Sequence, residues 1–185
     1  MQIKPLGLER VFEIQLASPK DERGFFCRTY DHQIFKEQGL HRDWVQESLS
    51  FSKVKGTVRG MHFQHPPHSE TKLITAISGE VFFAVVDLRK DSPTFGRWIS
   101  RILSEERMNG LYVPRGCANG LYTLTDNCRL AYKMDNLYSK ENEDIIRWDD
   151  PTIGIEWPIK RPVLISERDS KGQNFNTFKE KYGGL

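Results

Sequence analysis

The sequence predicts an all-β fold in which antiparallel strands form two packed sheets or a closed barrel, with one or two short helices. Two observations carry this prediction. Short runs rich in β-branched and aromatic residues recur along the chain, and turn residues, many of them Pro or Gly, separate these runs. We therefore expect alternate side chains of each strand to face a common interior.

The expected strands follow from local composition. Residues 11–16 alternate apolar and polar positions, and residues 25–30 come directly after the Asp-Glu-Arg-Gly turn at 21–24. Residues 80–88 form a long apolar run behind a glycine. Strands are expected in order at residues 11–16, 25–30, 72–78, 80–88, 98–103, 110–113, 121–125 and 129–134.

Helix signals are few. Asp31 is a suitable N-cap for a first helix, and Gly39 is a suitable stop. Between them, Ile34 and Phe35 would face the core. A second, weaker helical pattern covers residues 174–182. The chain is therefore expected to contain mostly strands, with these short helices outside the sheets.

Length and composition are typical of one globular domain, which we place at residues 1–185. Hydrophobic residues make up 38% and charged residues 28%, as in an ordinary globular protein. The formal net charge is +2, and the basic residues are scattered rather than grouped in a run or stripe. We therefore expect no nucleic-acid partner.

Targeting signals and cysteine usage indicate a cytoplasmic protein with no membrane partner. No apolar run approaches the roughly 18 residues that a membrane span needs. The first five residues lack the apolar core of a signal peptide. Cys27, Cys117 and Cys128 are odd in number and lack CxxC spacing, so we expect reduced thiols.

The most informative segment for function is residues 58–64, which contains His62 and is followed by Lys72 ten residues after the histidine. The two side chains are expected on neighbouring strands. A histidine titrates near neutral pH, and an ammonium group stabilises the oxygen of an enolate. This pair is therefore the minimum needed to remove a proton next to a ketone.

Strand alternation places two polar side chains on otherwise apolar faces. Lys72 shares a face with Ile74. Tyr132 shares a face with Leu130 and Met134. A polar group on such a face costs free energy unless it is paired or lines a cavity. Lys72 and Tyr132 are therefore candidates for a ligand pocket in the mouth of the barrel.

A series of short segments continues from about residue 8 to residue 170. The segments are Asp21-Glu22-Arg23-Gly24-Phe25-Phe26, Val45-Gln46-Glu47, Arg59-Gly60-Met61-His62-Phe63-Gln64, Val86-Asp87-Leu88-Arg89, Asp91-Ser92-Pro93-Thr94-Phe95-Gly96, Val113-Pro114-Arg115-Gly116, Ala131-Tyr132-Lys133, Trp148-Asp149-Asp150-Pro151, Ile155-Glu156-Trp157-Pro158 and Ser166-Glu167-Arg168-Asp169. Their order and spacing resemble the dTDP-4-dehydrorhamnose 3,5-epimerase family, whose members act on nucleotide-linked 4-keto-6-deoxy sugars.

This resemblance implies a cupin-like double-stranded β-helix jelly roll, a homodimer, and chemistry that needs no metal or other cofactor. It implies that the substrate is a nucleotide-diphosphate sugar. The reaction would invert C3, C5 or both, through removal of the proton α to the C4 ketone and return of a proton to the opposite face. The nucleotide, the sugar and the number of inverted centres stay open.

The resemblance also implies catalytic roles. His62 resembles the general base, and Asp169 resembles the carboxylate that orients it. Lys72 resembles the residue that stabilises the enolate, and Tyr132 resembles the acid on the opposite face. A nearby cation lowers the pKa of a tyrosine, and Lys72 is our candidate for that effect.

Binding residues are implied in the same way. Arg23 and Arg59 resemble contacts to the diphosphate, which arginine binds bidentately. Tyr138 resembles an aromatic that stacks on the base. The other positions expected to line the ligand are Gln46, Glu47, Glu143, Arg28, Ser48, Asn119 and Arg168.

Several of these positions depart from the family pattern. The family usually has glutamate at Arg28, asparagine at Ser48, histidine at Asn119, aspartate at Phe83 and lysine at Arg168. Because the departures gather around the expected ligand, they predict an altered substrate. We expect a nucleotide other than dTDP, a sugar that differs at C2 or C3, or inversion at only one carbon.

Clustered histidines suggest an alternative, because other cupins bind iron, zinc or manganese through histidines and a carboxylate. His62, His65, His68 and Glu70 are the residues in question. Two prolines interrupt the segment, and the remaining two histidines precede it, so no later histidine completes a site. We therefore favour metal-independent chemistry over a metal-dependent oxygenase or isomerase.

Two other functions are consistent with part of this pattern. A 3,4-ketoisomerase would share the fold and the enolisation but would move the carbonyl, and the presence of Tyr132 with His62 favours epimerisation. A non-catalytic sugar-nucleotide binding protein would need only the binding residues. The presence of all four catalytic positions argues against it.

Overall fold

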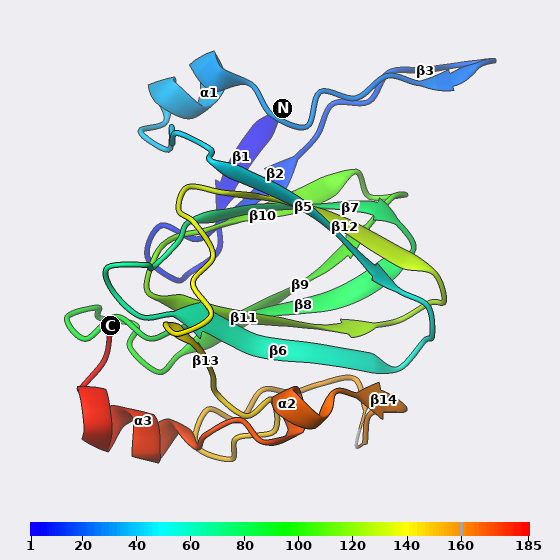
Figure 1. Ribbon diagram of the computed structural model, residues 1–185. Coiled ribbons are helices and arrows are strands. Elements are labelled where there is room, and N and C mark those ends of the chain that lie inside the picture. The colour runs from blue at the N-terminus through cyan, green and yellow to red at the C-terminus, as the bar shows by residue number, and fades with distance from the viewer. Residues whose placement is uncertain (160) are drawn as a thin grey trace.

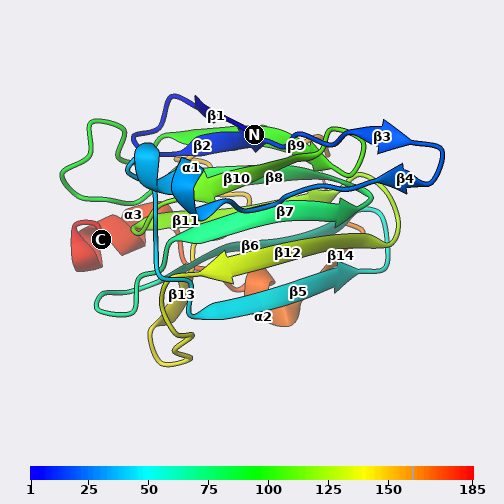
Figure 2. The same cartoon turned by 90° about the horizontal axis from the view of Figure 1, so that it is seen from above.

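Two facing, mainly antiparallel sheets form the body of the molecule (Figures 1 and 2). The computed structural model describes residues 1–159 and 161–185. The first sheet contains, in spatial order, β1 (Gln2–Pro5), β2 (Phe12–Gln15), β10 (Asn109–Val113), β7 (Lys72–Ser78), β12 (Cys128–Met134) and β5 (Gln46–Ser52). The second contains β13 (Glu143–Ile145), β6 (Thr57–Gln64), β11 (Cys117–Thr123), β8 (Glu80–Asp87) and β9 (Trp98–Ser104), with β14 (Leu164–Ile165) beside β6.

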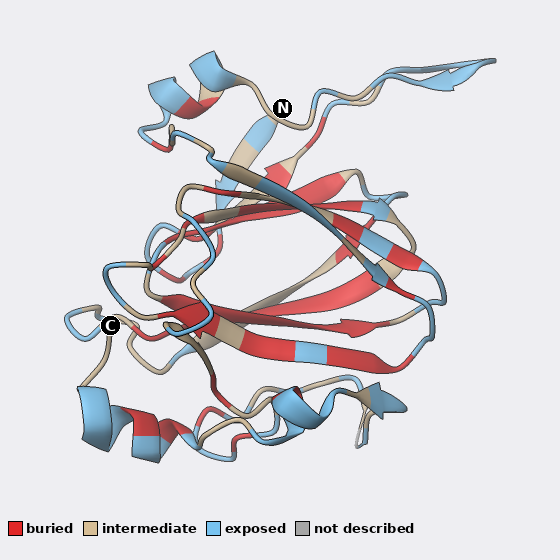
Figure 3. Cartoon of the chain, viewed as in Figure 1, coloured by how far each residue is buried: buried red, intermediate tan, exposed pale blue. Residues whose placement is uncertain are grey.

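The main core fills the space between the two sheets. Figure 3 shows buried residues along the strands of both sheets. The inward-facing side chains form one cluster that includes Ile74, Phe83, Val85, Leu111, Val113, Leu121 and Leu130. Removing this apolar surface from water is the main term that stabilises the fold. The predicted all-β architecture is confirmed.

The C-terminal segment covers the outer face of the second sheet (Figure 1). It contains α2 (Glu167–Ser170) and α3 (Phe175–Tyr182). Phe175 and Phe178 of α3 belong to a second buried cluster with Met61 and Phe63 of β6. This packing fixes the segment that carries Asp169 against the strand that carries His62.

Most of the predicted strands are confirmed. Strand β7 spans the predicted residues. Strands β8, β9, β10 and β12 differ from their predicted ranges by one residue at one end, and β2 is shorter by one residue at each end. The predicted strand 121–125 begins too late and ends too late, because β11 begins at Cys117 and ends at Thr123. The small residues at its start carry little strand signal, and pairing with both β6 and β8 decides their conformation.

The prediction of a strand at 25–30 is wrong. Strands β3 (Lys20–Asp21) and β4 (Gly24–Phe25) form a short hairpin that projects from the body (Figure 1). The exposed fractions of Phe25 and Phe26 are 56% and 79%, so these aromatic rings do not face the core. Strands β1, β5, β13 and β14 were not predicted, and the serine-rich β5 is held by pairing with β12 along its whole length.

The described chain contains three helices, one more than the upper limit predicted. The first, α1 (His32–Glu37), begins as expected, because the Asp31 carboxylate accepts hydrogen bonds from two backbone N–H groups of the first turn. The C-terminal prediction is confirmed by α3. The additional helix is α2, only four residues long. None of the helices in the described chain has the length and apolarity needed to cross a membrane.

Strands β6 and β11 approach each other closely at a pair of glycines. A Cβ atom on Gly60 would lie 2.5 Å from the Cα of Gly120, and the φ angle of Gly60 is +119°. Only glycine combines this backbone conformation with so little space. The close approach lies beside the Cα pairing of Asn119 with His62 and so helps to set the position of the histidine.

Candidate active site

The centre of the site is a hydrogen-bonded pair, His62 on β6 and Asp169 on α2. The distance from His62 Nε2 to Asp169 Oδ1 is 2.8 Å. The second carboxylate oxygen accepts a hydrogen bond from the backbone N–H of Gly60 at 3.2 Å. Ser166, the N-cap of α2, accepts from the backbone N–H of Asp169 at 3.0 Å. Both oxygens and the backbone of Asp169 are therefore fixed.

The surroundings of Asp169 keep it ionised. Burial alone would raise the pKa of Asp169, but the hydrogen bond and charge of His62 and the N–H of Gly60 outweigh it and lower the pKa below its ordinary value. An ionised carboxylate only accepts hydrogen bonds, so Nε2 of His62 carries the proton of this bond. The other ring nitrogen, Nδ1, is then available as a base.

Lys72 faces this pair from the opposite sheet. His62 and Asn119 are Cα partners in the second sheet, so their side chains share a face. The Asn119 side chain reaches across the interior, where its Oδ1 accepts from Lys72 Nζ at 3.0 Å. The expectation that His62 and Lys72 lie on neighbouring strands is corrected, because β6 and β7 belong to different sheets.

Tyr132 also points into the interior, from β12 of the first sheet. It is paired with Ile74, two residues from Lys72, and packs against the main core cluster. Burial raises the pKa of Tyr132, and the neighbouring Ser50 hydroxyl and the charge of Arg59 oppose this only in part. The idea that Lys72 lowers the pKa of Tyr132 is thus wrong. A tyrosine with a raised pKa stays protonated at neutral pH and can donate a proton.

Arg59 lies three residues before His62 on β6. Its Nε donates to Ser52 Oγ at 2.9 Å and one Nη donates to the Phe51 carbonyl at 3.0 Å, so it ties β6 to β5 of the other sheet. A pocket of about 390 Å³ next to it is lined by residues that include Arg59, His62, Arg168 and Asp169. Two arginines and the His–Asp pair therefore share one surface recess.

A second group of expected binding residues is linked by an ion pair and hydrogen bonds beside this recess. Arg168 lies 2.5 Å from Glu143 in an ion pair, and the Tyr138 hydroxyl donates to the same Glu143 oxygen at 2.7 Å. The Tyr138 backbone N–H donates to the Gln46 side chain at 2.7 Å. Tyr138 is 53% exposed, so its ring is accessible to a ligand.

Strand β5 divides the remaining expected residues between its two faces. Ser48 is the Cα partner of Tyr132, so it faces the interior with that tyrosine. Glu47 points the other way and forms an ion pair with Lys133 at 2.8 Å. Within one chain, the structure brings Ser48 to the site but leaves Glu47 on the outer face of the sheet.

Arg23 and Arg28 also lie apart from His62 within one chain. Arg23 belongs to the projecting hairpin, where it pairs with Asp21 at 2.7 Å and its side chain is 90% exposed. Arg28 pairs with Asp31, the N-cap of α1, at 2.9 Å. The departure at Phe83, by contrast, lies in the core between the sheets and is fully buried.

The three clustered histidines have separate partners. His62 contacts Asp169, whereas His65 Nε2 lies 3.1 Å from Asp144. The carbonyl of His68 accepts from Gln64 at 2.8 Å. Within residues 1–159 and 161–185, no group of three or more His, Cys, Asp or Glu residues is placed to hold a metal ion.

One residue beside Lys72 was not assigned to the site from the sequence. Glu70 Oε1 lies 3.1 Å from Lys72 Nζ, and the exposed fraction of the Glu70 side chain is 11%. The spacing of two residues along an extended segment is a signal that could have revealed the contact. From the sequence alone, Glu70 suggests only a metal ligand. Ser50 beside Tyr132 is a second residue that sequence reasoning missed.

The fold and the site define a jelly-roll enzyme that can remove and return protons. Comparison with known proteins gives the family. The sequence model of the dTDP-4-dehydrorhamnose 3,5-epimerase family matches residues 5–177. The chain is 42% identical over 167 residues to the dTDP-4-dehydrorhamnose 3,5-epimerase of Shigella flexneri, covering 88% of this chain and 91% of that protein.

Solved structures agree. One is a dTDP-6-deoxy-D-glucose-3,5-epimerase from Legionella pneumophila in complex with dTDP-4-keto-L-rhamnose, with a TM-score of 0.91, 34% identity and coverage of 97% of this chain and 95% of that one. Another is a 3'-monoepimerase from Streptomyces bikiniensis in complex with dTDP-quinovose, with a TM-score of 0.89, 29% identity and coverage of 97% and 90%. The chain belongs to the dTDP-4-dehydrorhamnose 3,5-epimerase family, with its cupin-like jelly roll, and is an enzyme of the isomerase class.

Proposed function

We propose that this protein epimerises a nucleotide-diphosphate-linked 4-keto-6-deoxyhexose at C3, C5 or both. The proposal rests mainly on one observation. His62, on one sheet, is held by the ionised Asp169 of α2. The side chains of Lys72 and Tyr132 enter the same interior from the other sheet. A base and an acid on opposite walls are what inversion of a carbon next to a ketone requires.

The proposed reaction assigns one step to each group. Nδ1 of His62 removes the proton α to the C4 ketone, and Asp169 stabilises the imidazolium that forms. Lys72 donates a hydrogen bond to the enolate oxygen. Tyr132 then gives its proton to the opposite face of the same carbon. General acid–base catalysis is worth about 10²–10⁴-fold, so stabilisation of the enolate must supply much of the rest.

The proposed binding roles use residues at the same recess. Arg59 and Arg168 would contact the diphosphate, since arginine binds phosphate oxygens through two parallel N–H groups. The exposed ring of Tyr138 would stack on the base. Gln46, Glu143 and Ser48 complete the proposed ligand environment, with Asn119 at the sugar end.

The proposal includes a substrate whose sugar differs from the one that most family members use. Asn119 departs from the family pattern, and its side chain contacts Lys72 between the sheets, where the ketone is expected. The relatives named above are dTDP-sugar enzymes, which makes dTDP the first nucleotide to test. One of the similar structures is a monoepimerase, so the number of inverted carbons should be measured.

The proposal includes a homodimer. The projecting hairpin carries Arg23 and exposes two phenylalanines, and the outer face of the first sheet exposes Leu49, Phe51 and Ile77. In a dimer, the hairpin of one copy would bring Arg23 and the nearby Arg28 towards the other copy. Light scattering on the eluted protein should give twice the 21.5 kDa of one chain, and a mass of 21.5 kDa would contradict the dimer.

A cytoplasmic location, with no nucleic-acid or membrane partner, completes the proposal. Cys27, Cys117 and Cys128 are all free thiols in the described chain, which suits a reducing compartment. Burial raises the pKa of the Cys117 thiol to about 12, so this thiol is unreactive at neutral pH. Fractionation of the source cells, followed by detection of the protein in the soluble cytosolic fraction, tests this location.

Incubation in D₂O tests the reaction. The 4-keto-6-deoxyglucose sugars of dTDP, UDP, GDP and CDP would each be incubated with the protein, and the products followed by NMR. We expect deuterium at C5, C3 or both of at least one substrate, together with inversion. Movement of the carbonyl to C3 would instead indicate a ketoisomerase, and binding without deuterium uptake from any substrate would indicate a binding protein.

A further inference from the structure

Lys72 is part of an ion pair inside the site. Its Nζ lies 3.1 Å from Glu70 Oε1, and the exposed fractions of the two side chains are 13% and 11%. Removing two charges from water costs free energy that the attraction between them does not always repay. An ion pair this well shielded, on a lysine that faces the proposed substrate, therefore calls for an explanation beyond stability.

The second contact of Lys72 supplies that explanation. Asn119 Oδ1 accepts a hydrogen bond from the same Nζ at 3.0 Å, so the ammonium is held by one hydrogen bond and one ion pair. Together these two contacts restrict the direction in which the rest of the ammonium group points. A lysine side chain is otherwise flexible, and fixing its donor before the reaction is what makes charge stabilisation effective.

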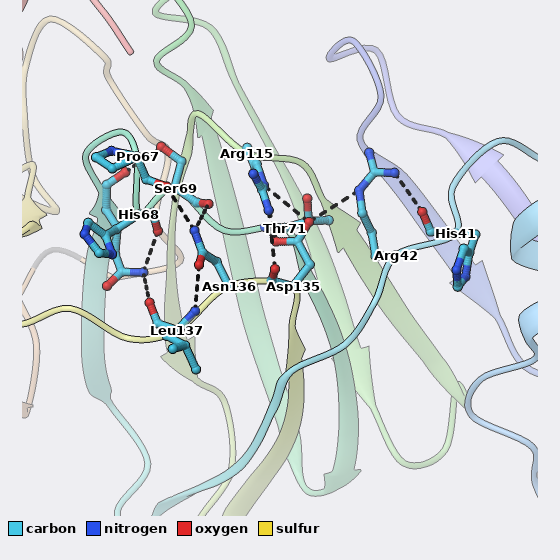
Figure 4. Close-up of polar contacts among 11 residues, drawn as sticks. His41, Arg42, Pro67, His68, Ser69, Thr71, Arg115, Asp135, Asn136 and Leu137 are labelled. Atoms are coloured by element: carbon cyan, nitrogen blue, oxygen red, sulfur yellow. Dashed lines mark hydrogen bonds and ion pairs between the residues drawn. The ribbon is translucent and has the colours of Figure 1, made fainter.

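The backbone is held on both sides of Glu70, at Ser69 and at Thr71 (Figure 4). The carbonyl of Ser69 accepts from Asn136 Nδ2 at 3.2 Å, and the N–H of Thr71 donates to Asp135 Oδ1 at 2.6 Å. Asp135 is nearly buried and forms ion pairs with Arg115 and Arg42 at 3.3 and 3.4 Å. The position of Glu70 is therefore set by the fold.

We infer that Glu70 is a positioning residue, whose carboxylate holds the Lys72 ammonium so that a free N–H group meets the enolate oxygen. This inference rests on the proposed function. The negative charge of Glu70 also weakens the positive potential at that oxygen, so its benefit is direction rather than charge. Orientation and charge can be separated, because glutamine keeps an acceptor oxygen in the same place without the charge.

The first test compares kcat and KM of three variants with the wild type. Glu70→Ala should lower kcat by about 10²-fold, the loss that a misplaced catalytic group causes, and leave KM within about twofold. Glu70→Gln should retain kcat within about threefold of wild type. Glu106→Ala, which removes an exposed glutamate from a distant turn, should behave as wild type. Equal losses in Glu70→Ala and Glu70→Gln, or no loss in either, would overturn the inference.

A double-mutant cycle tests whether Glu70 acts through Lys72. In a Lys72→Met background, Glu70→Ala should cause no further loss of kcat. The same fold-loss in both backgrounds would show an independent, structural effect and would overturn the inference. Glu70→Gln is available for the cycle should Glu70→Ala fail to fold.

Chemical labelling separates the failure of this inference from failure of the proposed function. The rate at which acetic anhydride modifies Lys72, read by mass spectrometry, does not depend on turnover. Labelling should be several-fold faster in Glu70→Ala than in Glu106→Ala, because the ammonium is no longer held. Unchanged labelling overturns the inference. Faster labelling in a protein that shows no epimerase activity would support the role of Glu70 and reject the proposed function.

Discussion

At the scale of single residues, the base of the proposed reaction depends on its partner. Asp169 accepts from His62 and from the backbone of Gly60, and its pKa is lowered although burial opposes ionisation. The sequence predicted this pair only through the resemblance to a family, because the two residues are 107 positions apart. No local pattern links residues at such a distance.

Replacing Asp169 with asparagine should reduce kcat by about 10²–10⁴-fold with little change in KM. Asparagine has nearly the same shape but lacks the charge that stabilises the imidazolium and fixes the proton on Nε2 of His62. Steady-state kinetics would measure the change. Asp149→Asn is the matched control, because Asp149 lies in an exposed ion pair with Arg147. Activity of Asp169→Asn within a few-fold of the control would contradict the assigned role.

Other residues show what strand alternation can and cannot predict. Alternation predicted the faces of Lys72 and Tyr132, and the structure confirms both, since Ile74 and Leu130 on those faces are fully buried. It could not reveal that Glu70 reaches Lys72, nor that Asn119 bridges the sheets. Such contacts depend on how two distant strands approach each other.

At the scale of elements, the close contact of β6 and β11 positions the catalytic histidine. A Cβ on Gly120 would lie 2.8 Å from the backbone oxygen of Arg59 and 2.5 Å from Met61 Sδ. Gly120 does not have a positive φ angle, so its need for glycine is purely one of space. The strand prediction began too late to include this residue.

Gly120→Ala should lower the free energy of unfolding by about 1–3 kcal/mol, the usual cost of overpacking, and should also lower activity by shifting β6. Urea unfolding and kcat would be measured together. Gly154→Ala is the control, because it has a φ of +67° and no neighbour closer than 3.8 Å. It should lose stability through backbone strain alone and keep full activity. Full activity in Gly120→Ala would contradict the idea that this contact places His62.

The predicted elements that failed share a physical cause. Residues 25–30 contain three aromatic residues and follow a turn, which is the usual signal for a core strand, but the rings of Phe25 and Phe26 are exposed at the projecting hairpin. Strand β5 has little strand signal and exists because β12 pairs with it. In both cases tertiary placement overrides local preference.

At the scale of the whole molecule, a buried carboxylate links acid stability to the fold. Asp87 accepts hydrogen bonds from Arg89, Ser92 and Thr94, and its side chain is fully buried. Burial opposes ionisation, yet these partners lower the pKa of Asp87 below its ordinary value of 3.8. The stabilisation that ionised Asp87 gives is therefore fully present at pH values above the ordinary pKa of 3.8. It is lost as the pH falls through the lowered pKa of the folded state.

Asp87→Asn should lower the free energy of unfolding by about 3 kcal/mol at pH 7, because it leaves the Arg89 charge without its partner. The loss should shrink as pH falls below 3.8, where the wild type loses the same contribution. Urea unfolding at several pH values would show this. Asp43→Asn, at a side chain that is 99% exposed, should follow the wild-type curve. A loss that stays constant down to the acid limit would contradict the linkage.

The arrangement of the two sheets makes the proposed chemistry possible. This arrangement could not be predicted from the sequence. The sequence predicted the strands, but it placed His62 and Lys72 on neighbouring strands. The fold instead separates them onto facing sheets, with the base on one wall and Lys72 and Tyr132 on the other. A sugar ring between the walls would be open to proton exchange from both sides.

The most direct test of this two-walled arrangement is the Tyr132→Phe variant in D₂O. Phenylalanine keeps the ring but removes the proton that the second wall supplies. Recovered substrate should carry deuterium α to the ketone with its configuration retained, since His62 still exchanges the proton, while inversion falls by about 10²-fold or more. Inversion at the wild-type rate would contradict the account.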